Sequence, residues 1–421
     1  MKKLTFFSTV LFLFLLLAPG SVMPQSNQNR PSQNNPNRPV SGDIETELLG
    51  IAESTLRVEH DVVVNNDPSS ARRRNPNAAR ARQANIERRI ERARGLHSFL
   101  RGRKVGFRDF QTRLEIKNLS VEGNVAILDA VEYTSKFYDL SIMAAGSPEQ
   151  SEEIIEHRFT FNLQNNQWEL VSDEILNAPG SIQGTSEEAI PSVSPNLDVT
   201  PSDPLAPPTS PQSSLPLVLS SPVKASRLES KDYSRLDGES NNSPVLLSQA
   251  SLNRQAIVQY IYYYALTPNR DYRNFENAGV QGGDCTNFVS QALKAGGWPS
   301  VQGWYRSDTN WWYDFSFVQP GQSWTWINAN YFFNFILNRP RARTIGRVAD
   351  LVPGDVISVD FDPQNNNGMD HTMLVSKKSN DGTIYLAYHT NNTIDKTFYE
   401  FYNNSSSSTK YYAWNLLPNY N

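Results

Sequence analysis

Cysteine and histidine are scarce in this chain of 421 residues, which contains one Cys and five His. A single Cys excludes an intramolecular disulfide, and no His-Glu-x-x-His motif or phosphate-binding glycine pattern is present, so we expect no metal and no other cofactor. The formal net charge of −4 excludes no class of partner, because it averages segments of very different composition.

Long apolar runs are also lacking, except near the N-terminus. Lys2 and Lys3 precede an apolar run at 11–17, which is followed by Ala-Pro-Gly at 18–20. This order is typical of a signal peptide, which we assign to residues 1–20. No other stretch approaches the roughly 20 apolar residues of a transmembrane helix, so we expect a secreted, extracytoplasmic protein without a transmembrane span.

Composition divides the remaining chain into four segments. Residues 21–42, rich in Asn and Pro, cannot bury enough apolar surface to fold, and we interpret them as a disordered tether. Residues 43–177 carry helix and strand patterns. Residues 178–250 form a Pro- and Ser-rich linker, which we expect to let two folded domains move independently. Residues 251–421 form the second domain.

The first domain begins with a helical pattern at 44–60 and then changes to a period of two. Strands are predicted at 114–117, 125–133, 157–163 and 168–173, and the last two form a hairpin. This is an α+β order, and with its ending Trp168-Glu-Leu-Val-Ser-Asp-Glu174 it resembles nuclear-transport-factor-2-like (NTF2-like) and cystatin-like domains. His60, His97 and His157 are interpreted as structural or surface residues.

An Arg-rich segment lies in the same domain. Residues 72–104 contain eleven Arg and one Lys against Glu87 and Glu91. Such a segment attracts anionic envelope polymers, for example wall teichoic acids or lipid headgroups. No aromatic residues interleave to stack on bases, so we expect no nucleic-acid partner. A solvated helix face is the alternative interpretation.

The single cysteine lies in Gly282-Gly-Asp-Cys-Thr-Asn-Phe-Val-Ser-Gln-Ala-Leu293. Asp284 is a good N-cap and apolar residues follow at helical spacing, so a helix should begin at Cys285 and end at Gly296-Gly297. A thiol in the first turn of a helix has a lowered pKa, which favours a nucleophile. A small buried apolar residue is the alternative interpretation.

Six tryptophans follow within a short stretch. They could line a cleft for sugars or peptides, or they could form core. They are Trp298, Trp304, Trp311, Trp312, Trp324 and Trp326.

Three strands are predicted at 355–361, 371–376 and 383–389, and Asn-Asp-Gly at 380–382 predicts a hairpin between the last two. Depending on the turn, the partner of His371 falls between residues 389 and 392. Asp370 alternates to the opposite face.

Cys285, His371 and a third polar residue, His389 or Asn391, are the parts of a thiol acyl-transfer site. The histidine takes the thiol proton and later protonates the leaving amine, while the third residue sets its tautomer. Zinc bound by Cys285, His371 and His389 is a competing interpretation, although ligands usually lie closer together in sequence. We expect activity to survive chelators.

These residues, in this order, resemble the secreted bacterial putative amidase domain, a papain-like family related to NlpC-type and CHAP-type cell-wall hydrolases. The resemblance covers residues 251–420 and implies a helix-borne nucleophile, Cys285, packed on an antiparallel sheet that carries the base, His371. It places the third residue on His389, with Asn391 as the alternative. It also implies cleavage of amide bonds in peptides or peptidoglycan. The matching segments are 263–265, 283–293, 296–297, 353–356, 370–372 and 388–390.

Two functions follow. The first is a secreted thiol-dependent amide hydrolase, a cysteine amidase or peptidase, with Asp284 supporting the catalytic residues. The second is a non-catalytic envelope-binding protein that holds glycans or peptides in an aromatic cleft. The intact Cys, His and His/Asn positions favour the first.

Overall fold

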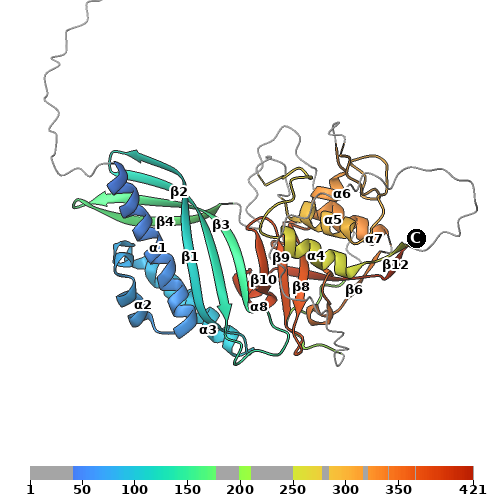
Figure 1. Ribbon diagram of the computed structural model, residues 1–421, viewed down its shortest axis with the longest axis horizontal. Helices are drawn as coiled ribbons and strands as arrows, with labels where there is room; N and C mark the ends of the chain where they lie inside the picture. The colour runs from blue at the N-terminus through green and yellow to red at the C-terminus, as the bar shows by residue number, and fades with distance from the viewer. Residues whose placement is uncertain are drawn as a thin grey trace, which may run out of the picture.

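The computed structural model describes residues 41–176, 199–209, 250–276, 284–315, 321–339, 341–365 and 367–420. Helices pack against one ten-stranded antiparallel sheet with strand order β1-β2-β3-β10-β9-β8-β7-β11-β6, and β4 also pairs with β3. Figure 1 shows the N-terminal half (41–176) on the left and the C-terminal half (250–420) on the right. Mixed helix and antiparallel sheet confirms the predicted α+β class.

The N-terminal half consists of helices followed by a meander of strands, as predicted. The helices are α1 (Ser41–Asn65), α2 (Pro68–Arg74), the 3₁₀ helix η1 (Pro76–Arg80) and α3 (Gln83–Arg101). The strands are β1 (Phe107–Glu122), β2 (Val125–Tyr138), β3 (Gln150–Gln164) and β4 (Gln167–Leu176), and the hairpin predicted between the last two is confirmed. Apolar residues of α1 and α3 share one core with the facing side of this sheet.

Histidines of this half take part in structural contacts. His157 is buried between two carboxylates, with Nδ1 2.7 Å from Asp173 and Nε2 2.9 Å from Glu132. The hydroxyl of Thr112 lies 3.0 Å from Nδ1 of His60, and His97 Nδ1 lies 2.6 Å from the carbonyl of Val63. Because each ring is held by the fold, these contacts agree with a structural interpretation.

Acidic partners neutralise much of the Arg-rich segment. Arg72 pairs with Glu87, Arg74 with Asp61, Arg80 with Glu47, Arg89 with Glu59 and Asp173, and Arg92 with Glu59. These ion pairs support the solvated-face interpretation, and binding of an anionic polymer stays a prediction.

The two halves are joined through the sheet. Residues of β3 pair directly with β10 (Thr393–Thr397), at Glu153↔Thr393 and Glu152↔Ile394. Behind this pairing, the partly buried Lys136 lies 2.7 Å from the buried Glu153 and 2.5 Å from the buried Glu400. The expectation that the halves move independently is therefore wrong for this structure, because backbone pairing and buried ion pairs fix them together.

The C-terminal half places helices on both faces of its strands. The strands are β6 (Ala342–Ile345), β7 (Val356–Asp360), β8 (His371–Lys378), β9 (Ile384–Tyr388), β10 and β11 (Lys410–Leu416), with the short pair β5 (Ala250–Ser251) and β12 (Asn419–Tyr420) apart. On one face lie α4 (Arg254–Tyr264), α5 (Cys285–Ala295), α6 (Trp324–Ile327) and α7 (Ala329–Asn338). The short helices η3 (Val348–Asp350) and α8 (Phe398–Asn404) pack on the other face. Both faces of β7, β8, β9 and β10 are therefore largely buried.

Most tryptophans of the Trp-rich stretch form core. Trp298, Trp311, Trp324 and Trp326 are buried with α5 and α7, whereas Trp304 is 64% exposed. These positions support the core interpretation over an aromatic cleft.

Part of the predicted linker, residues 199–209, packs against the C-terminal half. Ser202 donates from its backbone N–H to Tyr411, and Asp203 donates likewise to Gly346. The predicted signal peptide lies outside the described residues, as does nearly all of the tether. No helix within the described ranges is long and apolar enough to span a membrane.

Candidate functional site

Helix α5 begins and ends where the sequence predicts. Cys285 is its first residue, and Phe288, Val289 and Ala292 are fully buried on its inner face. Gly297 ends it at a φ of 96°, where Gly297 N–H donates to Lys294 and Trp298 N–H donates to Leu293. This bond pattern is a Schellman motif, which favours glycine because of its left-handed backbone. The helix is thus fixed at both ends, and its start is the position of the single thiol.

Asp284, the residue before the thiol, binds an imidazole instead of capping the helix with its side chain. Its Oδ2 accepts from His389 Nδ1 at 2.6 Å. Its Oδ1 accepts from the backbone N–H of Phe275 at 2.9 Å and from Nδ2 of Asn287 at 2.7 Å. Asn287 in turn accepts from Trp326 Nε1 at 2.9 Å. The carboxylate is therefore held in one orientation from three directions.

His389 is protonated in this arrangement. Its Nε2 lies 2.7 Å from the carbonyl oxygen of Tyr264, so a carboxylate and a carbonyl accept from the two ring nitrogens. Both nitrogens must therefore carry hydrogen. Burial lowers the pKa of His389, but the hydrogen bond and charge of Asp284 outweigh it and the pKa is raised. The imidazolium also lies at the C-terminal end of α4, and the carboxylate at the N-terminal end of α5, where the two helix dipoles favour these charges.

A tight turn follows His389 and leads into β10. Its central residues Thr390 and Asn391 have φ values of 67° and 64°, which are uncommon for residues other than glycine and strained for a β-branched threonine. The Thr390 hydroxyl accepts the backbone N–H of Asp284 at 3.3 Å. The turn thus binds the start of α5 twice, through His389 and through Thr390.

Cys285 is buried against the sheet. Its side chain is near the backbone of Thr372 in β8, and its Sγ lies 3.7 Å from the hydroxyl of Thr286, which itself lies 3.2 Å from that of Thr372. The residue is 1% exposed. Burial raises the pKa of the thiol more than these contacts lower it. The predicted lowered pKa is therefore wrong for this conformation, because desolvation outweighs the helix start.

His371 lies on the other face of the sheet from Cys285. It pairs with Val359 of β7, and its ring packs near Tyr388 and Phe401, with centroid separations of 5.2 Å and 6.2 Å. Thr372, the next residue, is the one that faces α5. Within the described part of the chain Nε2 of His371 has no hydrogen-bond partner, and burial lowers the pKa of His371 to about 3.

The structure thus bonds His389 to Asp284, the residue before Cys285, and it places His371 on the other face of the sheet. Asn391 lies at the tip of the turn, where its carbonyl accepts from the Thr393 hydroxyl. The expected pairing of His371 with His389 or Asn391 is not found. Successive residues of a strand face opposite sides, and here Thr372 faces α5 while His371 faces away from it. Because His371 lies behind the sheet, Cys285, His371 and His389 do not form the zinc ligand set considered above.

Carboxylates gather elsewhere, beside the end of β7. Ligand oxygens of Asp360, Asp362 and Asp370 lie within 4.8 Å of one another. Burial, followed by mutual repulsion, raises the pKa of Asp370 to about 6. Sequence reasoning placed Asp370 on the opposite face of the strand from His371 but did not anticipate this cluster.

The C-terminal half is similar to known proteins. Residues 251–414 match the model of the family described as "Putative amidase domain". Two curated relatives from Bacillus subtilis (strain 168), YjcM and YhbB, are both described as uncharacterized. YjcM is 31% identical over 150 residues, or 33% of this chain and 31% of its own length. YhbB is 32% identical over 129 residues, or 30% of this chain and 37% of its own length. The chain therefore spans about a third of these relatives.

Solved structures match with low overall similarity. The intermembrane space region of the chloroplast protein ARC6 has a TM-score of 0.24 and 14% identity, covering 33% of this chain and 98% of that one. Kfla4162 from Kribbella flavida has a TM-score of 0.22 and 12% identity, covering 32% of this chain and 91% of that one.

Proposed function

We propose that the C-terminal half is a thiol-dependent amide hydrolase in which Cys285 is the nucleophile and His389 the acid–base group. The observation that carries this proposal is the bond between Asp284 and His389, which fixes an imidazolium beside the helix turn that begins with the thiol. The match to the amidase family model supports hydrolysis of amides in general.

The carboxylate–imidazole pair has the arrangement that other acyl-transfer sites use. A carboxylate on Nδ1 fixes the ring and stabilises its charge, which leaves Nε2 to exchange a proton with substrate. The ring of His389 also stacks on Phe288 of α5, with centroids 4.2 Å apart, so it lies on the same side of the sheet as the thiol. His371, in contrast, lies on the other side of the sheet from the thiol, and its Nε2 has no described acceptor or donor.

The reaction follows from these charges. Once movement near the start of α5 exposes it, the Cys285 thiol loses its proton to solvent, because His389 is already protonated. The thiolate attacks the amide carbonyl and forms a carbon–sulfur bond. Nε2–H of His389 then leaves the Tyr264 carbonyl and protonates the leaving nitrogen as the carbon–nitrogen bond breaks. The neutral imidazole next removes a proton from water, which hydrolyses the thioester and restores the thiolate and imidazolium.

The described conformation is closed, because the thiol is 1% exposed. Substrate reaches Cys285 only after local movement near the start of α5. Opening and closing steps of this kind set the rate in many enzymes.

We further propose a papain-like architecture for the C-terminal half and an NTF2-like one for the N-terminal half. A helix-borne Cys on an antiparallel sheet supports the first, and helices on one face of a strand meander support the second. Secretion and a substrate with peptide or cell-wall amide bonds are part of the same proposal, and the charged and apolar N-terminal sequence supports secretion.

The test is a comparison of wild type with Cys285→Ala on a library of peptide amides, with released amine measured by mass spectrometry. We expect cleavage by the wild type and none above background by the folded variant. Cleavage that survives in Cys285→Ala contradicts the proposal.

A further inference from the structure

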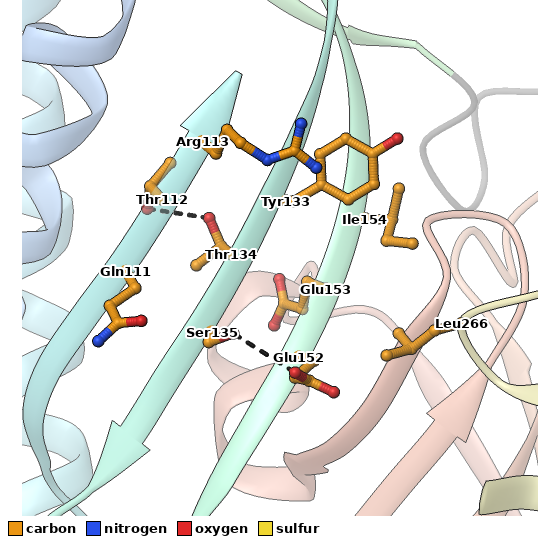
Figure 2. Close-up of a pocket in the computed structure, with 10 residues that line it drawn as sticks. All are labelled: Gln111, Thr112, Arg113, Tyr133, Thr134, Ser135, Glu152, Glu153, Ile154 and Leu266. Carbon is orange, nitrogen blue, oxygen red and sulfur yellow. Dashed lines mark hydrogen bonds between the residues drawn. The ribbon is translucent and has the colours of Figure 1, made fainter. Parts of the chain in front are cut away.

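A cavity of about 300 Å³ lies where the N-terminal sheet meets the C-terminal half. Figure 2 shows strands β1 to β3 on one side of it and Leu266, which follows α4, on the other. We propose that this cavity binds a primary ammonium group carried on an alkyl side chain of the amide substrate, with Glu152 as the acceptor. This inference rests on the proposed amide hydrolase.

The strand register builds one wall of the cavity. Arg113, Tyr133 and Ile154 stand in one cross-strand row, and Gln111, Ser135 and Glu152 form the next. Residues opposite one another in antiparallel strands carry their side chains on the same face. The wall is therefore a regular surface fixed by backbone pairing.

The apolar part of the lining suits a methylene chain. The Tyr133 ring, Ile154 and Leu266 border the cavity, and the Arg113 guanidinium lies 4.3 Å from the centre of the Tyr133 ring. Long cationic side chains bury their methylene groups along apolar surface and keep the charged end at a polar group. A lysine-like side chain meets both requirements in this cavity.

The charges of the lining leave one acid without a cation. Arg113 bonds Glu115 at 3.3 Å, so its charge has an acidic partner. Glu153 is bound by both Lys136 and Lys396, at 2.7 Å and 3.0 Å.

Glu152, by contrast, accepts only neutral donors among the described residues. Ser135 Oγ lies 3.4 Å away and Gln150 Nε2 lies 3.0 Å away. Its charge also adds to the repulsion on the nearby Asp395, whose pKa is raised to about 6 mainly by burial. The cavity therefore favours a cation at Glu152.

The cavity is also adjacent to the proposed catalytic site. The Ile154 N–H donates to the carbonyl of Asn392 at 2.8 Å, which joins the wall to the turn that follows His389. Leu266 lies two residues beyond Tyr264, whose carbonyl accepts from His389. A peptide in the cavity thus needs only a short extension to approach α5.

Binding tests the inference without requiring turnover. The full chain carrying Cys285→Ala is titrated calorimetrically with acetyl-Ala-Lys-Ala-amide and with its norleucine counterpart, which has the same methylene chain without the amine. We expect the lysine peptide to bind about tenfold more tightly, the gain of one partly desolvated charge-assisted hydrogen bond. Adding Glu152→Gln should abolish the difference, because glutamine keeps the shape and removes the charge.

The matched control is Glu122→Gln, an exposed acid at the far end of β1, which should leave the tenfold preference intact. Equal binding of the two peptides, or a lysine preference that persists in folded Glu152→Gln protein, overturns the inference. If the lysine preference is present but no amide is cleaved, the binding site stands and the proposed hydrolase fails. If Cys285-dependent cleavage is found without the lysine preference, the proposed hydrolase stands and the ammonium-binding site fails.

Discussion

His389 donates to Asp284 at 2.6 Å, and this bond connects the end of β9 to the residue immediately before Cys285. It spans 105 positions of sequence and holds an imidazole at the residue next to the only cysteine of the chain. The following expectations depend on this contact, on the separation of His371 from it, or on the junction between the two halves.

Substitutions at the two histidines should have unequal effects on cleavage. His389→Gln removes the proton carrier, so we expect kcat to fall by about 10² to 10⁴. His371→Phe should change kcat less than about threefold, because its ring packs among aromatic residues and Nε2 has no described partner. Circular dichroism shows whether each variant is folded. A large loss confined to His371→Phe would assign the base to His371 and imply a different strand register.

Alkylation of Cys285 should be slow and shifted to high pH in the substrate-free protein. Burial favours the neutral thiol, so the midpoint should lie above the roughly 8.5 of an ordinary thiol. The iodoacetamide labelling rate, measured from pH 6 to 11 by intact mass, checks this. A midpoint below that of a reference peptide would show that the closed conformation is not the dominant one.

His157 should make stability depend on pH in the alkaline range. Burial lowers its pKa, but bonds to Asp173 and Glu132 raise it to about 9. A raised folded-state pKa stabilises the protein fully below about 6.5, and this stability is lost as pH rises through 9. The shift corresponds to about 3 kcal/mol.

Urea unfolding of wild type and His157→Gln from pH 6 to 10 measures this contribution. His389 changes stability in the same direction, so the difference between the two proteins isolates His157. His60 has a lowered pKa and acts at more acidic pH. The stability difference between the proteins should shrink as pH rises, and a constant difference would contradict the assignment.

Cutting the chain between the halves should leave them associated. A protease site placed between residues 176 and 199 interrupts the covalent connection and leaves residues 199–209 on the C-terminal fragment, so only the β3–β10 pairing and the Lys136 contacts are expected to hold the fragments together. After cleavage, we expect the two fragments to co-elute in size-exclusion chromatography at low micromolar concentration. Separate elution would support tethered, independent domains. Lys136→Met should weaken the association, since it leaves Glu400 buried without this cation.

The sequence predicted the local features of the site well. Asp284, the apolar spacing after Cys285 and Gly297 together define α5, and the Asn-Asp-Gly loop defines the β8–β9 hairpin. The orientation of β8 was not predictable in the same way. Thr372 and Leu374 face one side while Met373 and Val375 face the other, and both sides are buried. With no polar face to set the alternation, the pattern does not show which side carries His371.

The junction of the halves was also beyond the sequence pattern. Glu153 and Thr393 pair although 240 positions separate them, and each strand has an ordinary pattern by itself. A long Pro- and Ser-rich linker favours independent domains when only composition is considered. In the sequence, Lys396 and Glu400 have the pattern of surface charges, and their burial becomes visible only once β10 is placed beside β3.

The most direct test of the central claim is the mass of the protein during turnover. A peptide amide that is cleaved by the wild type is mixed with excess protein, and the reaction is quenched in acid within the first turnover. The account predicts a transient mass increase equal to the acyl portion, mapped by digestion to Cys285 and absent from Cys285→Ala. Product formation with no adduct in wild type, and at an unchanged rate in Cys285→Ala, would contradict it.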